Sequence, residues 1–198
     1  TRPGLYFPIF RNRGGYDDLL VQESTDICIE GFPRSANSFA AGAFEYAQAN
    51  EVKMAHHTHV AANAMQACKL GVPTIVLIRN PVDAVISNVS LAKEVHLVEH
   101  GKLLGEDELV GFRPQISAWT AFYSALKPYQ EAFVTAPFSR VIKDMGAVIR
   151  ATNAHFGTSF TPFQHSEENA ARVHQSRGYH AGPNERRASI KERTRTSF

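Results

Sequence analysis

At 198 residues, with a hydrophobic share of 43% and a charged share of 20%, the chain is expected to form one globular domain with a substantial core, because two domains would be cramped. The formal net charge of +2 is too small to indicate nucleic acid as a partner, and no apolar run approaches the roughly 20 residues that cross a bilayer, so no membrane partner is expected. The two cysteines make no disulfide framework, so we expect a reducing, cytoplasmic compartment; whether a leader or an anchor precedes Thr1 stays open.

The first part of the chain predicts an irregular lead-in followed by a strand, a loop and a helix. Residues 1–20 mix prolines and glycines with aromatic residues, so we expect no regular element there. Residues 26–30 carry the continuous apolar run of a strand buried on both faces, and residues 38–49 have apolar side chains at helical spacing. The loop at residues 31–38 therefore stands in the strand, loop, helix order of a phosphate-binding unit.

This loop has the groups that bind an oxyanion. Besides backbone N–H groups at a helix N-terminus, it offers a fixed charge, two hydroxyls and an amide, on Arg34, Ser35, Ser38 and Asn37. Its length also matches the Walker A frame G-x-x-x-x-G-K-(S/T), but Ala36 stands at the second glycine and Asn37 at the lysine. The pattern therefore favours an anion geometry different from that of ATP or GTP phosphotransferases, with a degenerate P-loop kinase as an alternative.

The middle of the chain continues the alternation of strands and helices. We expect an extended segment, an alanine-rich helix ended by Gly71, a β-branched strand, and a helix with Pro81 in its first turn, over residues 51–59, 61–70, 74–78 and 82–90. Such alternation predicts an α/β fold with a central, mainly parallel sheet. Ligands bind such sheets at the carboxyl ends of the strands, so the loops after the first and the β-branched strand are expected to contact one ligand.

The remaining residues are predicted to form a lid, two helices, a strand and an arm. Residues 92–114 mix histidines, glycines and Pro114, which favours a helix end followed by a lid-like loop. A helix, a strand and a second helix are expected over residues 114–133, 138–142 and 146–156. After Thr161 the composition turns polar, and residues 165–198 are expected to form a basic surface arm.

Three segments together resemble the sulfotransferases that use 3′-phosphoadenosine 5′-phosphosulfate (PAPS): GFPRSANSF, HHTHV and VLIRNPVDAVIS, at residues 31–39, 56–60 and 76–87. The first is similar to the family pattern P-(K/R)-S-G-(T/S)-(T/S), and the last to R-(D/N)-P-x-D-x-x-x-S. The resemblance covers about residues 26–160. It implies a three-layer fold like that of P-loop nucleotide hydrolases, and transfer of a sulfuryl group to a hydroxyl or amine of a small-molecule or carbohydrate acceptor, with no metal.

The resemblance also implies roles for individual residues. The first loop would hold the 5′-phosphosulfate, and Arg79 and Ser87 would hold the 3′-phosphate. The residues expected to bind PAPS are Arg34, Ser35, Ala36, Asn37, Ser38, Phe39, Arg79, Ser87 and, in place of the family's basic C-terminal segment, Arg187. The chain departs from the family at Ala36, where glycine is usual, and at Asn37, where a hydroxyl is usual.

Arg34 and His59 are the candidate catalytic residues. Sulfuryl transfer places charge on the equatorial and bridging oxygens, so Arg34 is the expected stabiliser of the transferred group. An acceptor hydroxyl also needs a base, and His56, His57 and His59 follow the extended segment; on a strand, His57 and His59 would share a face. The resemblance implies His59 as the base and places His57 where a lysine is often found. A metal site and histidines without a catalytic role are the alternatives.

Less specific interpretations fit some of the same residues. The segment from Arg79 to Ser87 could be no more than a strand end before a proline-started helix. Trp119, Phe122 and Tyr123 are more typical of a core than of a surface that stacks an acceptor. A domain that binds the nucleotide without catalysis is the alternative to an enzyme, and nothing in the sequence identifies the acceptor or the oligomeric state.

Overall fold

The computed structural model describes residues 19–105, 110–178, 182 and 185–196. The irregular lead-in expected at residues 1–20 therefore lies almost entirely outside the described residues. Within them, four parallel strands form one sheet in the order β2-β1-β3-β4, where β1 is Ile27–Gly31, β2 Met54–His56, β3 Thr74–Ile78 and β4 Val134–Pro137. The predicted α/β class with a parallel sheet is confirmed.

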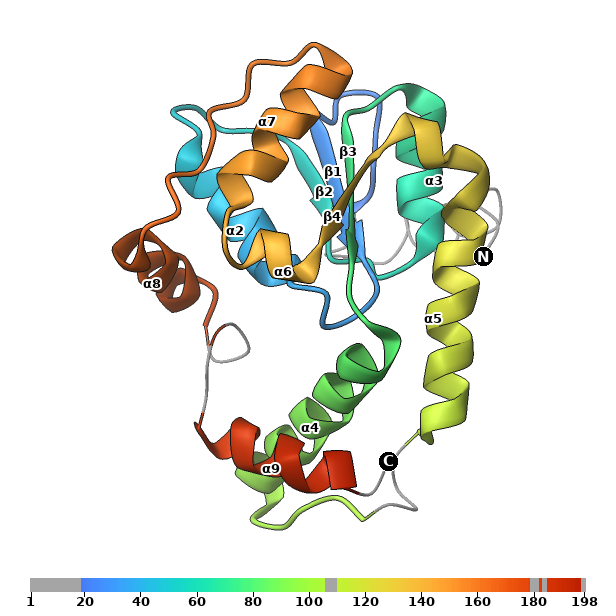
Figure 1. The fold of residues 1–198 in the computed structure, drawn as a ribbon, viewed down its shortest axis with the longest axis vertical. Coiled ribbons are helices and arrows are strands. Elements are labelled where there is room, and N and C mark those ends of the chain that lie inside the picture. The colour runs from blue at the N-terminus through green and yellow to red at the C-terminus, as the bar shows by residue number, and fades with distance from the viewer. Residues whose placement is uncertain (1–18, 106–109, 179–181, 183–184, 197–198) are drawn as a thin grey trace.

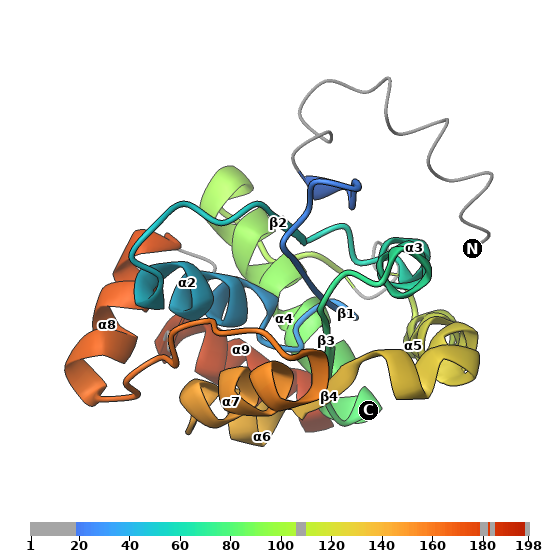
Figure 2. The ribbon, with the colours of Figure 1, turned by 90° about the horizontal axis from the view of Figure 1, so that it is seen from above.

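Helices cover both faces of this sheet and give three layers (Figures 1 and 2). Helices α2, α6 and α7 lie on one face, and α3 and α5 lie on the other. Their bounds are α2 Asn37–Ala47, α3 Ala61–Leu70, α5 Phe112–Leu126, followed by the 3-10 helix η3 Lys127–Ala132, α6 Phe138–Val141 and α7 Met145–Phe156. This architecture is the three-layer, P-loop-like arrangement that the resemblance implies.

The apolar run of β1 is buried on both faces because its side chains alternate between the two helical layers. Ile27 and Ile29 belong to the core cluster that includes α2 and α7, whereas Cys28 belongs to the cluster on the α3 side. All three are completely buried. Glu30, the next residue, is also completely buried although it is charged.

Helix α4, Pro81–His100, starts at the carboxyl end of β3 and extends away from the sheet (Figure 1). The Asn80 side chain caps it by accepting hydrogen bonds from the N–H groups of Val82 (3.0 Å) and Asp83 (3.3 Å), and Gly101 ends it in the left-handed conformation. The helix end predicted near residue 92 therefore lies at His100, and the lid-like loop predicted after it narrows to residues 101–111, of which 106–109 lie outside the described residues. The histidines of α4 suggested a break, but the buried Ser90 and Glu94 keep helical spacing along one face.

Two more helices, α8 Glu167–Ser176 and α9 Glu185–Thr196, occupy the region expected to be a polar arm. Helix α9 packs along α4, and the two extend beyond the sheet on the side of the carboxyl strand ends (Figure 1). Its polar sequence conceals three buried side chains, on Arg187, Ile190 and Thr194. No described helix, including α4, is both long and apolar enough to cross a membrane.

Three other element predictions change in detail. The strand predicted at residues 138–142 is wrong: β4 precedes it and ends at Pro137, and Phe138 begins helix α6. The helix predicted over 114–133, with a stop near Pro128, begins at Phe112 and ends at Leu126, and Pro128 falls in the following 3-10 turn. The extended segment predicted over 51–59 narrows to β2, because His57 and His59 have a left-handed backbone. The predictions of α3 and β3 match at both ends.

Candidate functional site

The loop between β1 and α2 is shaped by two left-handed residues. Arg34 (φ 67°) and Ala36 (φ 72°) flank Ser35, which has negative φ. Alternation of this kind turns successive backbone N–H groups toward one side and forms a concave site for an anion. The first bond of α2 runs from the Ala40 N–H to the Ala36 carbonyl (2.9 Å), so the amides of residues 37–39 are the N-terminal donors of the helix.

Gly31 and Asn37 fix this loop against β3. A Cβ atom at Gly31 would lie 2.7 Å from the Leu77 carbonyl oxygen, so only glycine allows the strand ends to approach this closely. The Asn37 side chain donates a hydrogen bond from Nδ2 to the Phe32 carbonyl (3.1 Å) and is almost fully buried. Asn37 therefore braces the loop from within through Nδ2, whereas its buried Oδ1 has no hydrogen-bond partner among the described residues.

The loops after β1 and β3 meet at the carboxyl edge of the sheet. Arg79 donates a hydrogen bond from Nη1 to the Arg34 carbonyl (2.9 Å), and Arg34 donates one from Nε to Ser87 Oγ (3.2 Å). These contacts join the two segments as the parallel order of β1 and β3 predicts. Ser87 lies about two turns into α4, so its hydroxyl faces back toward the strand ends.

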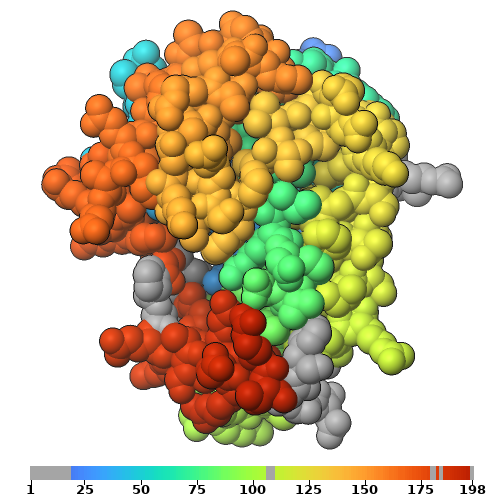
Figure 3. Space-filling model, in the orientation of Figure 1, coloured from blue at the N-terminus to red at the C-terminus, as the bar shows by residue number. Residues whose placement is uncertain are grey.

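A cavity of about 830 Å³ opens between these loops, α4 and α9. In the space-filling view, the surface of α9 (red) lies below that of α6 and α8 (orange), and the chain is indented between them (Figure 3). Every predicted site residue except Ser35 lines the cavity: Arg34, Ala36, Asn37, Ser38, Phe39, His59, Arg79, Ser87 and Arg187. Ser35 is fully buried behind the loop.

Four cationic side chains face this cavity: Arg34, Arg79, Arg187 and Lys191. Burial, reinforced by the charges of Arg187 and Arg79, lowers the pKa of Arg34 to about 10. Burial also lowers the pKa of Arg79 and of Lys191. The fully buried carboxylate of Glu94 on α4 forms an ion pair with Arg187 on α9. The cavity thus gathers partly dehydrated positive charge, which an anionic ligand would stabilise.

The imidazole of His59 has a defined hydrogen-bond direction. Its Nδ1 lies 3.1 Å from the Gly31 carbonyl oxygen, which can only accept, so the neutral ring carries its proton on Nδ1. Nε2 is then the unprotonated nitrogen. Because His59 also lines the cavity, this nitrogen is available to take a proton from a bound acceptor.

His57 and His56 form a second group beside the loop. His57 Nε2 lies 3.0 Å from Ser38 Oγ, and its Nδ1 contacts Nδ1 of His56. Burial, followed by the neighbouring His56 and His59, lowers the pKa of His57 to about 3. His57 is therefore neutral at neutral pH and adds no positive charge to the site. The described residues contain no group of three or more side chains arranged to hold a metal ion.

The aromatic residues of α5 support the strand ends and do not line the large cavity. Trp119 donates a hydrogen bond from Nε1 to the Arg79 carbonyl (3.1 Å), and Tyr123 donates its hydroxyl proton to the Leu77 carbonyl (2.7 Å). Phe122 is buried in the core on the same side of the sheet. The prediction that these side chains belong to the core is confirmed.

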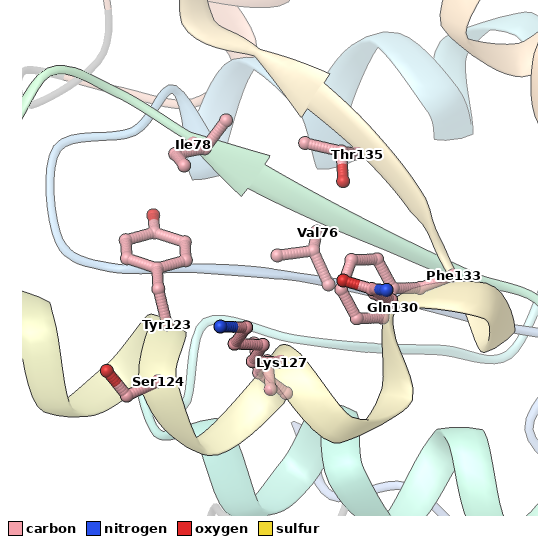
Figure 4. A pocket seen from close by; sticks show the side chains of 9 residues that line it. Val76, Ile78, Tyr123, Ser124, Lys127, Gln130, Phe133 and Thr135 are labelled. Atoms are coloured by element: carbon pink, nitrogen blue, oxygen red, sulfur yellow. The ribbon is translucent and has the colours of Figure 1, made fainter.

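A smaller cavity of about 350 Å³ lies between the β3–β4 edge and the segment formed by α5 and η3 (Figure 4). Val76, Tyr123, Lys127 and Thr135 are among its lining residues, and it shares none with the large cavity. The Tyr123 hydroxyl, one of the polar groups in its wall, is bonded to the Leu77 carbonyl. This cavity is therefore separate from the cationic one.

Two contributors to the site were not selected from the sequence. The guanidinium of Arg79 lies 3.9 Å from the centroid of the Phe138 ring, which stacks against it from α6. Glu30 accepts hydrogen bonds from the segment that carries His59. The signal for Glu30 was present, since a carboxylate inside a buried apolar strand needs partners, whereas nothing local indicates the position of Phe138.

Comparison with known proteins finds similarity to solved structures, among them a sulfotransferase. No protein-family model matches the sequence, and no curated protein matches it. The crystal structure of mouse sulfotransferase SULT7A1 complexed with PAP aligns with a TM-score of 0.48 at 13% sequence identity, over 83% of this chain and 67% of that chain. At this level of similarity, the role of each site residue depends on the contacts described above.

Proposed function

We propose that this protein is a sulfotransferase that moves a sulfuryl group from PAPS to a hydroxyl or amine of a small-molecule or carbohydrate acceptor. The observation that carries the proposal is the junction of the two loops, where Arg34 contacts Ser87 and Arg79 contacts Arg34. This junction brings the N-terminus of α2 beside a guanidinium and a hydroxyl, from Arg79 and Ser87. A ligand with two separate anionic groups matches that arrangement.

The donor set of the cavity fits such a ligand. In this proposal the phosphosulfate occupies the loop, against Arg34, Ser38 and the first amides of α2. The 3′-phosphate then lies with Arg79 and Ser87, and Arg187 approaches it from α9. Dehydrated cations favour a dianionic phosphate because binding replaces the water that burial has removed.

Each residue has a defined part in the transfer. His59 Nε2 takes the proton of the acceptor hydroxyl as its oxygen bonds to sulfur. The bond between sulfur and the 5′-phosphate oxygen breaks, and its electron pair leaves with adenosine 3′,5′-bisphosphate. Arg34 and the N–H groups at the start of α2 stabilise the charge that develops on the transferred group and the leaving oxygen.

A degenerate P-loop kinase is less compatible with the site. The Walker lysine would stand at position 37, but Asn37 carries no charge and its side chain is bonded to the Phe32 carbonyl. The cations of the cavity reach it instead from Arg34, β3 and α9. Their arrangement favours a phosphate on the α4 side of the loop over a linear triphosphate.

Calorimetry with adenosine 3′,5′-bisphosphate tests the nucleotide site. We expect binding to the wild type, and at least ten-fold weaker binding in Arg79→Ala and Ser87→Ala, because a charged hydrogen bond contributes about 1.5–3 kcal/mol. Arg172→Ala is the control, since Arg172 pairs with Glu168 on the exposed face of α8. Tight binding of ATP without detectable binding of the bisphosphate would contradict the proposal and favour a kinase.

His59→Ala distinguishes an enzyme from a domain that only binds the nucleotide. With labelled sulfate donor and a panel of acceptors, we expect turnover to be lost while the affinity for the bisphosphate stays nearly unchanged. A loss of roughly 100-fold or more is typical when a general base is removed. Wild-type turnover in His59→Ala would exclude His59 from the base role.

A further inference from the structure

Glu30 is a buried carboxylate at the carboxyl end of β1, and its side chain is completely inaccessible to solvent. A charge in such a position is destabilising unless hydrogen bonds satisfy it. Four donors do so: the Thr58 N–H (2.9 Å), the Thr58 hydroxyl (2.6 Å), Asn63 Nδ2 (3.0 Å) and the His59 N–H (3.2 Å). All four are neutral groups, so each bond is charge-assisted from the Glu30 side.

The two carboxylate oxygens divide these donors between them. Oε1 accepts from Thr58 and Asn63, whereas Oε2 accepts from the backbone of His59. Acceptance on both oxygens is a property of a carboxylate, because an amide has only one acceptor oxygen. The site therefore selects glutamate over its isostere glutamine.

Glu30 and its neighbour Gly31 hold His59 at two points. Glu30 Oε2 bonds the backbone N–H of His59, and the Gly31 carbonyl bonds ring Nδ1 (3.1 Å). His59 has a left-handed backbone (φ 55°), a conformation that persists only where surrounding contacts enforce it. The direction of the His59 ring is thus set by the central strand β1. Glu30 fixes the backbone of His59, and Gly31 fixes its imidazole.

We propose that Glu30 is a positioning residue for His59, which keeps Nδ1 on the Gly31 carbonyl and thereby presents unprotonated Nε2 to the cavity. This inference rests on the proposed function for its catalytic meaning. Its structural content, the coupling of Glu30 to the tautomer of His59, does not depend on the substrate.

Nitrogen NMR of the His59 ring in the full chain tests this coupling without any substrate. In the wild type at neutral pH we expect the Nδ1-protonated tautomer to dominate. In Glu30→Gln, an amide NH2 group replaces one carboxylate oxygen and faces an N–H or O–H donor that the oxygen accepted from. We expect this repulsion to displace the segment that carries His59, so that both tautomers of its ring are populated. Glu30→Asp keeps both acceptor oxygens but moves them back by one methylene, so it should give a spectrum between those of the wild type and Glu30→Gln. It replaces Glu30→Gln as the test variant if Glu30→Gln does not fold.

Kinetics supply the second readout. We expect kcat to fall at least ten-fold in Glu30→Gln while the Kd for adenosine 3′,5′-bisphosphate changes less than about two-fold. Thr58→Val is the matched control, because it removes one bond to Oε1 and leaves the Oε2 bond to His59 intact. Its kcat should stay within about three-fold of the wild type.

The outcomes separate the two proposals. An unchanged His59 spectrum in a folded Glu30→Gln or Glu30→Asp variant overturns the positioning role, whatever the activity. Absence of bisphosphate binding and turnover in the wild type instead overturns the proposed function, while the ring spectrum still tests Glu30.

Discussion

Four described residues other than glycine have a left-handed backbone, and all of them lie at the candidate site: Arg34, Ala36, His57 and His59. Each such conformation costs of order 1–2 kcal/mol for a residue with a Cβ atom. The strain is concentrated in the loop between β1 and α2 and in the segment that carries His59, the candidate base. The hydrogen bonds that Glu30 and Gly31 accept from His59, and the one that Arg79 donates to the Arg34 carbonyl, hold these two segments in place.

Ala36→Gly tests how much the left-handed backbone of residue 36 destabilises the loop between β1 and α2. Glycine adopts the left-handed conformation without steric cost but loses more backbone entropy on folding, so we expect the free energy of unfolding to rise by up to about 1 kcal/mol. Urea unfolding of the purified chain checks this. Ala40→Gly, in the helical conformation of buried α2, should instead destabilise by about 1 kcal/mol or more. Destabilisation by Ala36→Gly would show that its methyl group contributes packing that outweighs the strain.

The neutral His57 predicts a pH dependence of stability. Its pKa falls from 6.5 to about 3 on folding, so between these values the unfolded chain binds a proton that the folded chain does not. Stability should therefore decrease as pH falls through this window, by at most about 1.4 kcal/mol per pH unit and by less because the ring is partly exposed. Unfolding midpoints at about pH 7 and about pH 5 should differ less in His57→Asn than in the wild type.

Asparagine suits this test because it tolerates the left-handed backbone of position 57. His155→Asn, on the exposed face of α7, should keep the pH difference of the wild type. An equal pH difference in His57→Asn and the wild type would contradict the assignment to His57.

At the scale of elements, α4 and α9 make the cavity's outer wall, and the Glu94–Arg187 ion pair joins them. The pair is buried on both sides, with Glu94 at 0% and Arg187 at 8% side-chain exposure. A second, exposed pair between Asp83 and Arg195 (2.8 Å) links the same helices further along. Only the buried pair is expected to contribute much to the free energy of unfolding, because an exposed ion pair contributes about 0–1 kcal/mol.

Glu94→Gln should lower the free energy of unfolding by about 3–5 kcal/mol, the usual cost of removing one partner from a buried pair. The substitution leaves Arg187 with less compensating charge in a cavity that also holds Arg34 and Arg79. Thermal unfolding is measured with and without adenosine 3′,5′-bisphosphate. We expect the ligand to raise the Tm of Glu94→Gln by more than it raises the Tm of the wild type. Glu168→Gln breaks an exposed pair with Arg172 and is the control. An unchanged Tm in Glu94→Gln would mean that the pair does not hold α9 in place.

At the scale of the whole molecule, the parts predictable from sequence are those governed by local periodicity and by parallel topology. The strand at Thr74–Ile78 and the helix at Ala61–Leu70 follow from β-branched and alanine-rich runs bounded by proline and glycine. Because β1 and β3 are neighbours, the loops that follow them had to meet. For that reason the sequence allowed the proximity of Arg34 and Ser87 to be predicted.

The rest depended on contacts between distant segments. Helix α9 has almost no apolar periodicity, and it is placed by burial of Arg187 against Glu94, which no local pattern indicates. The left-handed backbone at His59 overrides the extended preference of its segment because Glu30 accepts hydrogen bonds from the N–H groups of Thr58 and His59. Phe138 begins a helix only because β4 ends at Pro137.

The place of α9 also has a consequence for synthesis. Arg34 and Arg79 are synthesised before Arg187 and Lys191, because they precede them in the sequence. Domains fold as they are made, from the N-terminus onward, so the sheet can assemble while the cationic cavity still lacks the wall that α9 forms. The nascent protein therefore passes through a stage in which the core is formed but the cavity is not yet enclosed by α9.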